Sequence, residues 1–125
     1  QDKRVLSKTI RTAKKEQRIA LIAEDDSVSA AMNELSFVHA YVVDEFGTLV
    51  PDAANKIDFE VEGDGAKIVA TDNGNTTDHT RFQSTSRRAF HGKVLVIVSS
   101  KNKGQIVVKA KSKGLISGEV HIKVE

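Results

Sequence analysis

Alternation of apolar and polar residues is the feature that most constrains what this chain can fold into. In residues 57–62, Ile57, Phe59 and Val61 alternate with acidic residues. A period of two places every second side chain on the same face of an extended strand. The segment is therefore predicted to be a strand with one buried and one solvated face. The three- to four-residue spacing of an amphipathic helix is nearly absent from the chain.

Six further segments have the alternation or the β-branched composition of strands, and Gly, Asn, Asp and Pro residues separate them. They are residues 18–23, 37–42, 67–71, 93–99, 105–110 and 119–125. About seven short strands joined by such turns predict an all-β fold, an immunoglobulin-like antiparallel β-sandwich.

The length of 125 residues suits a single domain with one core. We expect this β-sandwich domain to span residues 13–125. Residues 1–12 hold only Val5, Leu6 and Ile10 as large apolar residues, which is typical of a linker that leaves a preceding domain.

Charge and composition exclude several classes of function. The 19 Lys and Arg residues nearly balance 17 Asp and Glu, and they are spread over many strands, so nucleic acid is not an expected partner. The chain has no cysteine, which excludes disulfides, thiolate metal sites and a cysteine nucleophile. The longest apolar run, Val94 to Val98, is far shorter than the roughly 20 residues of a membrane helix. Residues 1–11 are too polar for a signal-peptide core.

The polar segment from Asp72 to Phe90 is the most unusual part of the sequence, because loops of this length are uncommon in compact domains unless they are functional or mobile. Within or next to it, three arginines surround two phenylalanines, and these are the candidate binding residues: Arg81, Phe82, Arg87, Arg88 and Phe90. Guanidinium groups bind carboxylates and stack on rings. The cluster could hold the loop in place, which is the leading interpretation, dock a neighbouring domain or contact sugar.

Catalytic residues are not predicted. Glycoside hydrolysis needs two carboxylates fixed across a cleft. The acidic residues lie in predicted turns or on the polar side of a strand, where solvation is the expected role. They include Asp25, Asp26, Asp44, Glu45, Glu60, Glu62 and Asp64.

A metal or other cofactor is not predicted either. The four histidines, His39, His79, His91 and His121, include no pair at the spacing of two or four residues that metal sites on one element use.

Three aromatic side chains share one side of a predicted strand. His39 lies on the side that also carries Phe37 and Tyr41. We expect this side to be partly covered, and a preceding domain is one candidate for the cover. The chain has no Trp and one Tyr, so the exposed aromatic platform of many carbohydrate-binding modules is not predicted.

Three stretches resemble one family when taken together. They are LSFV at 35–38 with VVDEFG at 42–47 and VPDA at 50–53, the turn DNGN at 72–75, and RAFHGKVLV at 88–96. The chain resembles, over roughly residues 9–125, the C-terminal immunoglobulin-like domain of family-2 glycoside hydrolases of the β-galactosidase type found in gut Bacteroidetes.

The resemblance implies that this chain is an accessory module of a larger enzyme. In such enzymes the catalytic glutamates lie in a (β/α)8 barrel of roughly 250 residues, for which this chain has no room. The expected role is non-catalytic, packing against or spacing the other domains of a β-galactosidase-like enzyme that is periplasmic or secreted. The alternative is a bacterial immunoglobulin-like module that binds carbohydrate or a surface partner.

Overall fold

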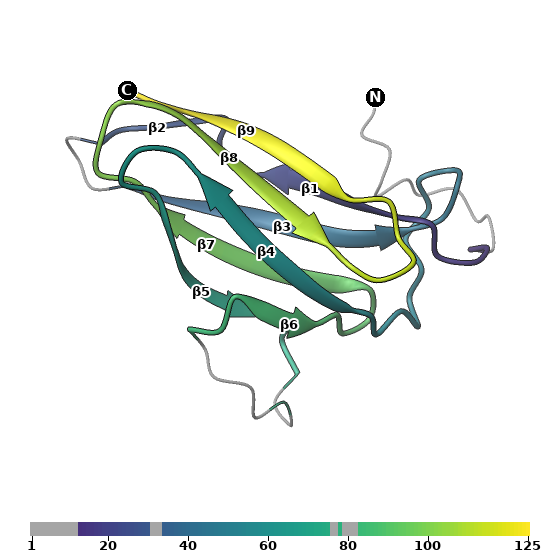
Figure 1. The fold of residues 1–125 in the computed structure, drawn as a ribbon. Coiled ribbons are helices and arrows are strands. Elements are labelled where there is room, and N and C mark those ends of the chain that lie inside the picture. The colour runs from purple at the N-terminus through teal and green to yellow at the C-terminus, as the bar shows by residue number, and fades with distance from the viewer. Residues whose placement is uncertain (1–12, 31–33, 76–77, 79–82) are drawn as a thin grey trace.

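The computed structural model describes residues 13–30, 34–75, 78 and 83–125. In these residues the chain forms nine strands and no helix, and the strands build two sheets packed face to face (Figure 1). The predicted all-β sandwich is confirmed. The predicted linker, residues 1–12, lies outside the described residues, so the proposed domain boundary stays a prediction.

One sheet has four strands, and each neighbouring pair is antiparallel. In spatial order these are β1 (Arg18–Ala23), β3 (Leu35–Val43), β7 (Lys93–Ser99) and β5 (Lys67–Asp72). A β-bulge between Ile68 and Ala70 shifts the pairing of β5 with β7 by one residue. We call this four-stranded layer sheet A.

The second layer, sheet B, has five strands. In spatial order they are β2 (Ser27–Val28), β9 (Gly118–Val124), β8 (Gly104–Lys111), β4 (Lys56–Glu62) and β6 (Ser86–Arg88). The pairing of β2 with β9 is parallel, and the other pairs are antiparallel.

The prediction of about seven strands is corrected to nine among the described residues. All seven expected segments form strands, and the two additional ones are β2 and β6, which have two and three residues. Strands this short contain too few residues to show an alternating pattern. The β6 strand also divides the segment from Asp72 to Phe90, which the sequence had indicated to be one long loop.

The core lies between the two sheets and is built mainly from valine and isoleucine. On β3 and β7 the inward side chains include Val38, Val42, Val96 and Val98, all fully buried. They pack in one cluster with inward residues of sheet B such as Ile57, Phe59, Ile106, Val108 and Ile122. Burying each such side chain contributes about 1.5–3 kcal/mol, and this is why the alternation of the sequence specifies the fold.

At one edge of the sandwich, β1 lies close to β9. The Ile19 N–H donates to the carbonyl of Ile116 at 3.0 Å, and the Ile116 N–H donates to the carbonyl of Gln17 at 2.9 Å. A Cβ atom on Gly118 would lie 2.5 Å from the Ile19 carbonyl oxygen. The two sheets therefore meet at this edge through backbone, and a glycine is needed at position 118.

Candidate functional site

Arg87, a predicted binding residue, is buried at the opposite edge of the sandwich. Only 4% of Arg87 is exposed. Its Nε donates a hydrogen bond of 2.9 Å to Oγ1 of Thr71, on β5, and its Nη1 lies 3.4 Å from Oδ2 of Asp78. Arg87 thus connects β6 of sheet B to β5 of sheet A, and its guanidinium is directed into the protein.

Polar side chains around Arg87 extend this network along the segment between β5 and β6. The Thr71 hydroxyl donates to the Ser84 carbonyl at 2.8 Å. The Asn73 amide nitrogen lies 2.7 Å from both Asp78 Oδ2 and the Arg88 carbonyl oxygen. These contacts fix the two ends of the segment to the sandwich.

Two other predicted binding residues, Arg88 and Phe90, do not point the same way as Arg87. Arg88 is exposed on the outer side of β6, where its Nη1 donates to the Ala54 carbonyl at 3.0 Å. Phe90 is half-buried, and its ring packs on the His91 ring with a centroid separation of 4.1 Å. Arg81 and Phe82 lie outside the described residues. A binding role for the cluster stays a prediction.

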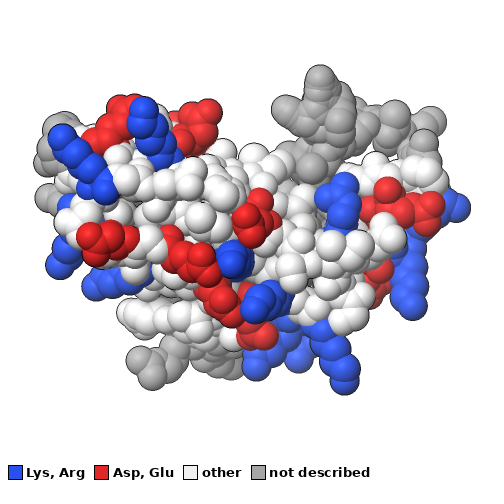
Figure 2. Space-filling model, turned by 45° about the horizontal axis from the view of Figure 1, so that its top comes forward, with Lys and Arg blue, Asp and Glu red and all other residues white. Residues whose placement is uncertain are grey.

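The outer face of sheet B is charged. Glu62 lies 2.9 Å from the Lys109 ammonium and raises the pKa of that lysine, first through the hydrogen bond and then through its charge. Glu60 pairs with Lys111 on the same strands at 3.1 Å. Figure 2 shows acidic and basic side chains interleaved on this side of the molecule. These side chains are solvated, as the sequence predicted for the acids of β4.

Asp44 is the exception among the acids, because the expected solvated turn residue is fully buried. Its carboxylate accepts backbone N–H groups from Phe46 at 2.8 Å, Thr48 at 2.9 Å and Lys14 at 2.9 Å. Hydrogen bonds to the charged form compensate for the loss of water. The residue order Asp-x-Phe-Gly was compatible with a turn, but it did not reveal that Lys14, thirty residues away, would complete the site.

The outer face of sheet A carries a group of apolar side chains, in contrast to that of sheet B. Paired residues of adjacent strands point to the same side of a sheet, and the register of sheet A aligns Ile22 with His39 and Leu95, and Phe37 with Ile97. We call this surface the A face; its apolar members are Ala20, Ile22, Leu35, Phe37, Leu95 and Ile97.

Several large A-face side chains remain open to solvent. Ile22 is 36% exposed and Leu35 is 40% exposed, while Phe37, Leu95 and Ile97 are half-buried. An exposed sheet face normally carries polar side chains, as sheet B does, and contiguous apolar surface marks an interaction site. The sequence indicated that Phe37 and Tyr41 share this face. It did not indicate that Leu95 and Ile97 of β7 lie beside them, because residues 94–98 are an unbroken apolar run with no alternation.

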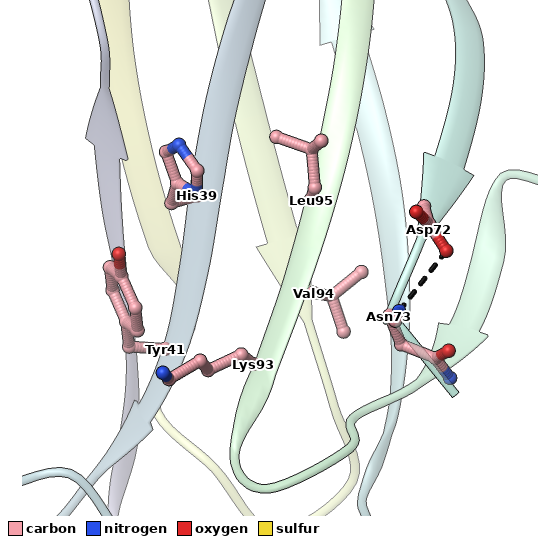
Figure 3. Close-up of a pocket in the computed structure, with 8 residues that line it drawn as sticks. His39, Tyr41, Asp72, Asn73, Lys93, Val94 and Leu95 are labelled. Carbon is pink, nitrogen blue, oxygen red and sulfur yellow. Dashed lines mark hydrogen bonds between the residues drawn. The ribbon is translucent and has the colours of Figure 1, made fainter. Parts of the chain in front are cut away.

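One end of the A face is polar and hollowed. A cavity of about 160 Å³ lies over β3, β7 and β5, and Figure 3 shows Lys93 extending across it toward Tyr41. The facing wall is formed by Asp72 and Asn73. Apart from Asn73 and Gly74, which follow β5, the lining residues belong to strands of sheet A, so the sheet itself shapes the cavity.

The aromatic side of this cavity holds the chain's single tyrosine. The Tyr41 and His39 rings are nearly parallel, at 13°, with centroids 6.2 Å apart. His39 Nε2 lies 2.7 Å from Oε2 of Glu24. Burial, and to a lesser degree the charge of Glu24, raises the pKa of Tyr41 above its usual value. The Tyr41 hydroxyl is therefore neutral over the physiological range.

No group of three or more His, Cys, Asp or Glu side chains in the described part of the chain could hold a metal ion. Nor does a helix long and apolar enough to cross a bilayer occur among those residues.

Several glycoside hydrolases contain a region that is similar to this chain. The family Glycoside hydrolase family 2 C-terminal domain 5 matches residues 19–121. The β-galactosidase BoGH2A of Bacteroides ovatus is 39% identical over 122 residues, which are 97% of this chain and 14% of that protein.

Two solved structures show the same fold. A family 2 glycosyl hydrolase of Bacteroides cellulosilyticus superposes with a TM-score of 0.86 at 31% identity, covering 91% of this chain and 15% of that one. A β-glycosidase of Bacteroides vulgatus gives a TM-score of 0.85 at 29% identity, with the same coverage of 91% and 15%.

This chain therefore spans about one seventh of the length of the relatives that it matches. The predicted resemblance is confirmed by a family match that covers most of the sandwich and by an identity well above 30% with one relative. The chain belongs to the glycoside hydrolase family 2 C-terminal domain 5 family.

Proposed function

We propose that this chain is a non-catalytic accessory module of a β-galactosidase-like glycoside hydrolase and that its A face packs against another domain of that enzyme. The contrast between the two outer faces carries the proposal. Sheet B presents paired charges to water, whereas sheet A presents Ile22, Leu35 and Phe37. A neighbouring domain of the same polypeptide is the natural cover, because this chain matches only about one seventh of each relative.

The non-catalytic role is supported by the geometry of the acids. Two carboxylates must face each other across a substrate cleft for glycoside hydrolysis. In the described residues, Glu60 and Glu62 lie side by side on an open strand face and are paired with lysines, and Asp44 is enclosed by backbone N–H groups. The β-galactoside preference of the parent enzyme rests on the name of the Bacteroides ovatus relative.

An activity assay tests this part of the proposal. The isolated chain is expected to hydrolyse a nitrophenyl galactoside no faster than buffer, while the parent enzyme hydrolyses it. The non-catalytic role would be disproved if hydrolytic activity co-purified with the isolated chain and remained after trace parent enzyme had been removed.

Docking through the A face is tested by comparing the same substitution in two contexts. Ile22→Ser and Leu35→Ser are expected to change the stability of the isolated chain little, because both side chains are already partly exposed. In the parent enzyme each is expected to cost about 0.5–1 kcal/mol more than in the isolated chain, since docking buries the remaining apolar surface. The control is Lys111→Ser on the outer face of sheet B, which we call the B face; this substitution should cost the same in both contexts. Equal costs of the A-face substitutions in the two contexts would refute the docking role.

The alternative role, carbohydrate binding, is favoured by one observation, the cavity between Tyr41 and Asp72. Titration of the isolated chain with galactosides and longer glycans should then produce saturable shifts of the amide resonances of Asp72, Asn73 and Lys93. An unchanged spectrum over a broad panel excludes this role. The periplasmic or secreted location implied by the resemblance stays a prediction.

A further inference from the structure

Two exposed apolar side chains lie away from the A face. Phe46, in the turn after β3, is 51% exposed, and Ile116, in the connection between β8 and β9, is 59% exposed. They are the two most exposed large apolar residues in the described part of the chain. Neither belongs to the charged B face or to the A face, so the docking of sheet A does not account for them.

The fold brings these two residues to the same end of the sandwich. Arg18, the first residue of β1, pairs with Val43 on one side and forms a bridge with Ile116 on the other. A Cβ atom on Gly47, next to Phe46, would lie 3.4 Å from Nη2 of Arg18. Figure 1 shows β3 ending and β9 beginning at the end where β1 begins. We call Phe46 and Ile116, on either side of Arg18, the tip patch.

Both members of the tip patch are held in place by backbone hydrogen bonds. The Phe46 N–H donates to the buried Asp44 carboxylate at 2.8 Å, and the Gly47 N–H donates to the Asp44 carbonyl at 3.0 Å. The Ile116 carbonyl accepts from the Ile19 N–H in β1, and the Ile116 N–H donates to the carbonyl of Gln17, the residue before β1. An apolar side chain presented by a preorganised backbone loses little conformational entropy on docking, which favours its use as an interface anchor.

The chain that enters the domain is fastened to the same turn. The Lys14 N–H donates to Oδ2 of Asp44 at 2.9 Å. The part of the chain that precedes Lys14 therefore joins the sandwich at this end, so a domain that precedes the module is connected to it next to the tip patch.

We propose that the domain that precedes this module in the parent enzyme docks on the tip patch. That domain presents an apolar surface to Phe46 and Ile116. The inference rests on the proposed function, since it assumes the larger enzyme, but it assigns a different surface and a defined partner. With the tip patch covered, the module is held in one orientation to the preceding domain, and the connection does not act as a flexible hinge.

The test uses the parent enzyme with Phe46→Ser and Ile116→Ser combined, and follows trypsin cleavage after Lys14 and Lys15. Both lysines are exposed in the isolated chain. Burying the exposed halves of the two apolar side chains together shifts a docking equilibrium at least about tenfold, so the double variant should be cut at least about tenfold faster than the wild-type parent. Phe46→Leu with Ile116→Val keeps the apolar surface and should restore slow cleavage.

Two controls make the outcomes distinguishable. The same double variant in the isolated chain should unfold in urea at the wild-type midpoint, which shows that the sandwich itself is intact. The A-face pair Ile22→Ser and Leu35→Ser is cut in parallel. Unchanged cleavage of the tip variant overturns the inference, even where the A-face variants show that the proposed docking of sheet A holds. If the isolated chain instead forms a dimer that the tip substitutions dissociate, the occupant is a second copy and the inference is equally overturned.

Discussion

At the scale of single residues, Asp44 has the clearest consequence for stability. Replacing it with Ala leaves three backbone N–H groups, of Lys14, Phe46 and Thr48, without their acceptor. We expect Asp44→Ala to lower the free energy of unfolding by about 2–3 kcal/mol, measured by urea denaturation. Asp44→Asn should lose less, because one oxygen can still accept from Phe46 and Thr48. The exposed neighbour Glu45 is the control, and an equal loss in Glu45→Ala would contradict this role of the Asp44 carboxylate.

Tyr41 gives the chain a built-in pH reporter. Its pKa is raised above the ordinary value of 10.0, first by burial and then by Glu24. The folded state therefore keeps its phenol proton at a pH where the unfolded state has lost it. The contribution of Tyr41 to the free energy of unfolding is fully present below pH 10.0 and is lost as the pH rises through the pKa of the folded state. Because the chain has one Tyr and no Trp, absorbance of the tyrosinate reports this group alone. We expect a midpoint above 10.0 in the folded chain and a return toward 10.0 in urea; equal midpoints would show that the folded environment does not act on the phenol.

Asp44 and Arg87 mark the limit of what the sequence predicts at the scale of single residues. Alternation identified the inward side chains of β4, such as Ile57 and Phe59, because the pattern is local. The burial of Asp44 depends on Lys14, and that of Arg87 depends on Thr71 and Asp78. Such partners are distant in sequence, so a carboxylate or a guanidinium was assigned to solvent or to a binding site by its residue type alone.

At the scale of the elements, the shortest strands depend most on side chains. β6 has three residues and pairs only with β4 within sheet B, and Arg87 supplies its buried side-chain link to β5 of sheet A. We expect Arg87→Met to lower the free energy of unfolding by about 2–3 kcal/mol, since Thr71 and Asp78 lose a charged hydrogen-bonding partner. Hydrogen exchange at the Ala89 amide, which donates to the Asn55 carbonyl next to β6, should accelerate more than exchange in β7.

Arg88→Met is the matched control for this prediction, because Arg88 is on the same strand and exposed. Its effect on stability should stay within about 0.5 kcal/mol. If the two substitutions had the same effect, the network around Arg87 would not be what holds β6.

The same dependence explains which elements the sequence could predict. β3 and β7 are long enough for Val38 to Val42 and Val94 to Val98 to show both period and burial. β2 and β6 exist because β9 and β4 offer them an edge, and this is a property of the assembled sheet. The A face is an intermediate case: the run from Val94 to Val98 was compatible with cover on both sides of β7, but only the register of sheet A aligns Leu95 with Ile22 across β3.

At the scale of the whole molecule, the sandwich is joined at both edges. Backbone hydrogen bonds between β1 and Ile116 close one edge, and Arg87 closes the other. One hydrophobic cluster contains side chains of both sheets. Neither sheet can separate without exposing that cluster, so the module should unfold as one cooperative unit, with the stability of each sheet dependent on the other.

Urea unfolding of the isolated chain measures this cooperativity. Circular dichroism follows both sheets, whereas Tyr41 fluorescence follows sheet A alone, and the two transitions are expected to coincide. Gly118→Ala places a Cβ atom 2.5 Å from the Ile19 carbonyl oxygen, which should cost about 1–3 kcal/mol and lower both midpoints together. Ser117→Ala, at the exposed residue just before β9, should leave both midpoints unchanged. A Gly118→Ala variant in which the dichroism transition splits into two steps, of which only the first coincides with the fluorescence transition, would mean that the sheets unfold separately, because the strain would then loosen β1 and sheet A without affecting sheet B.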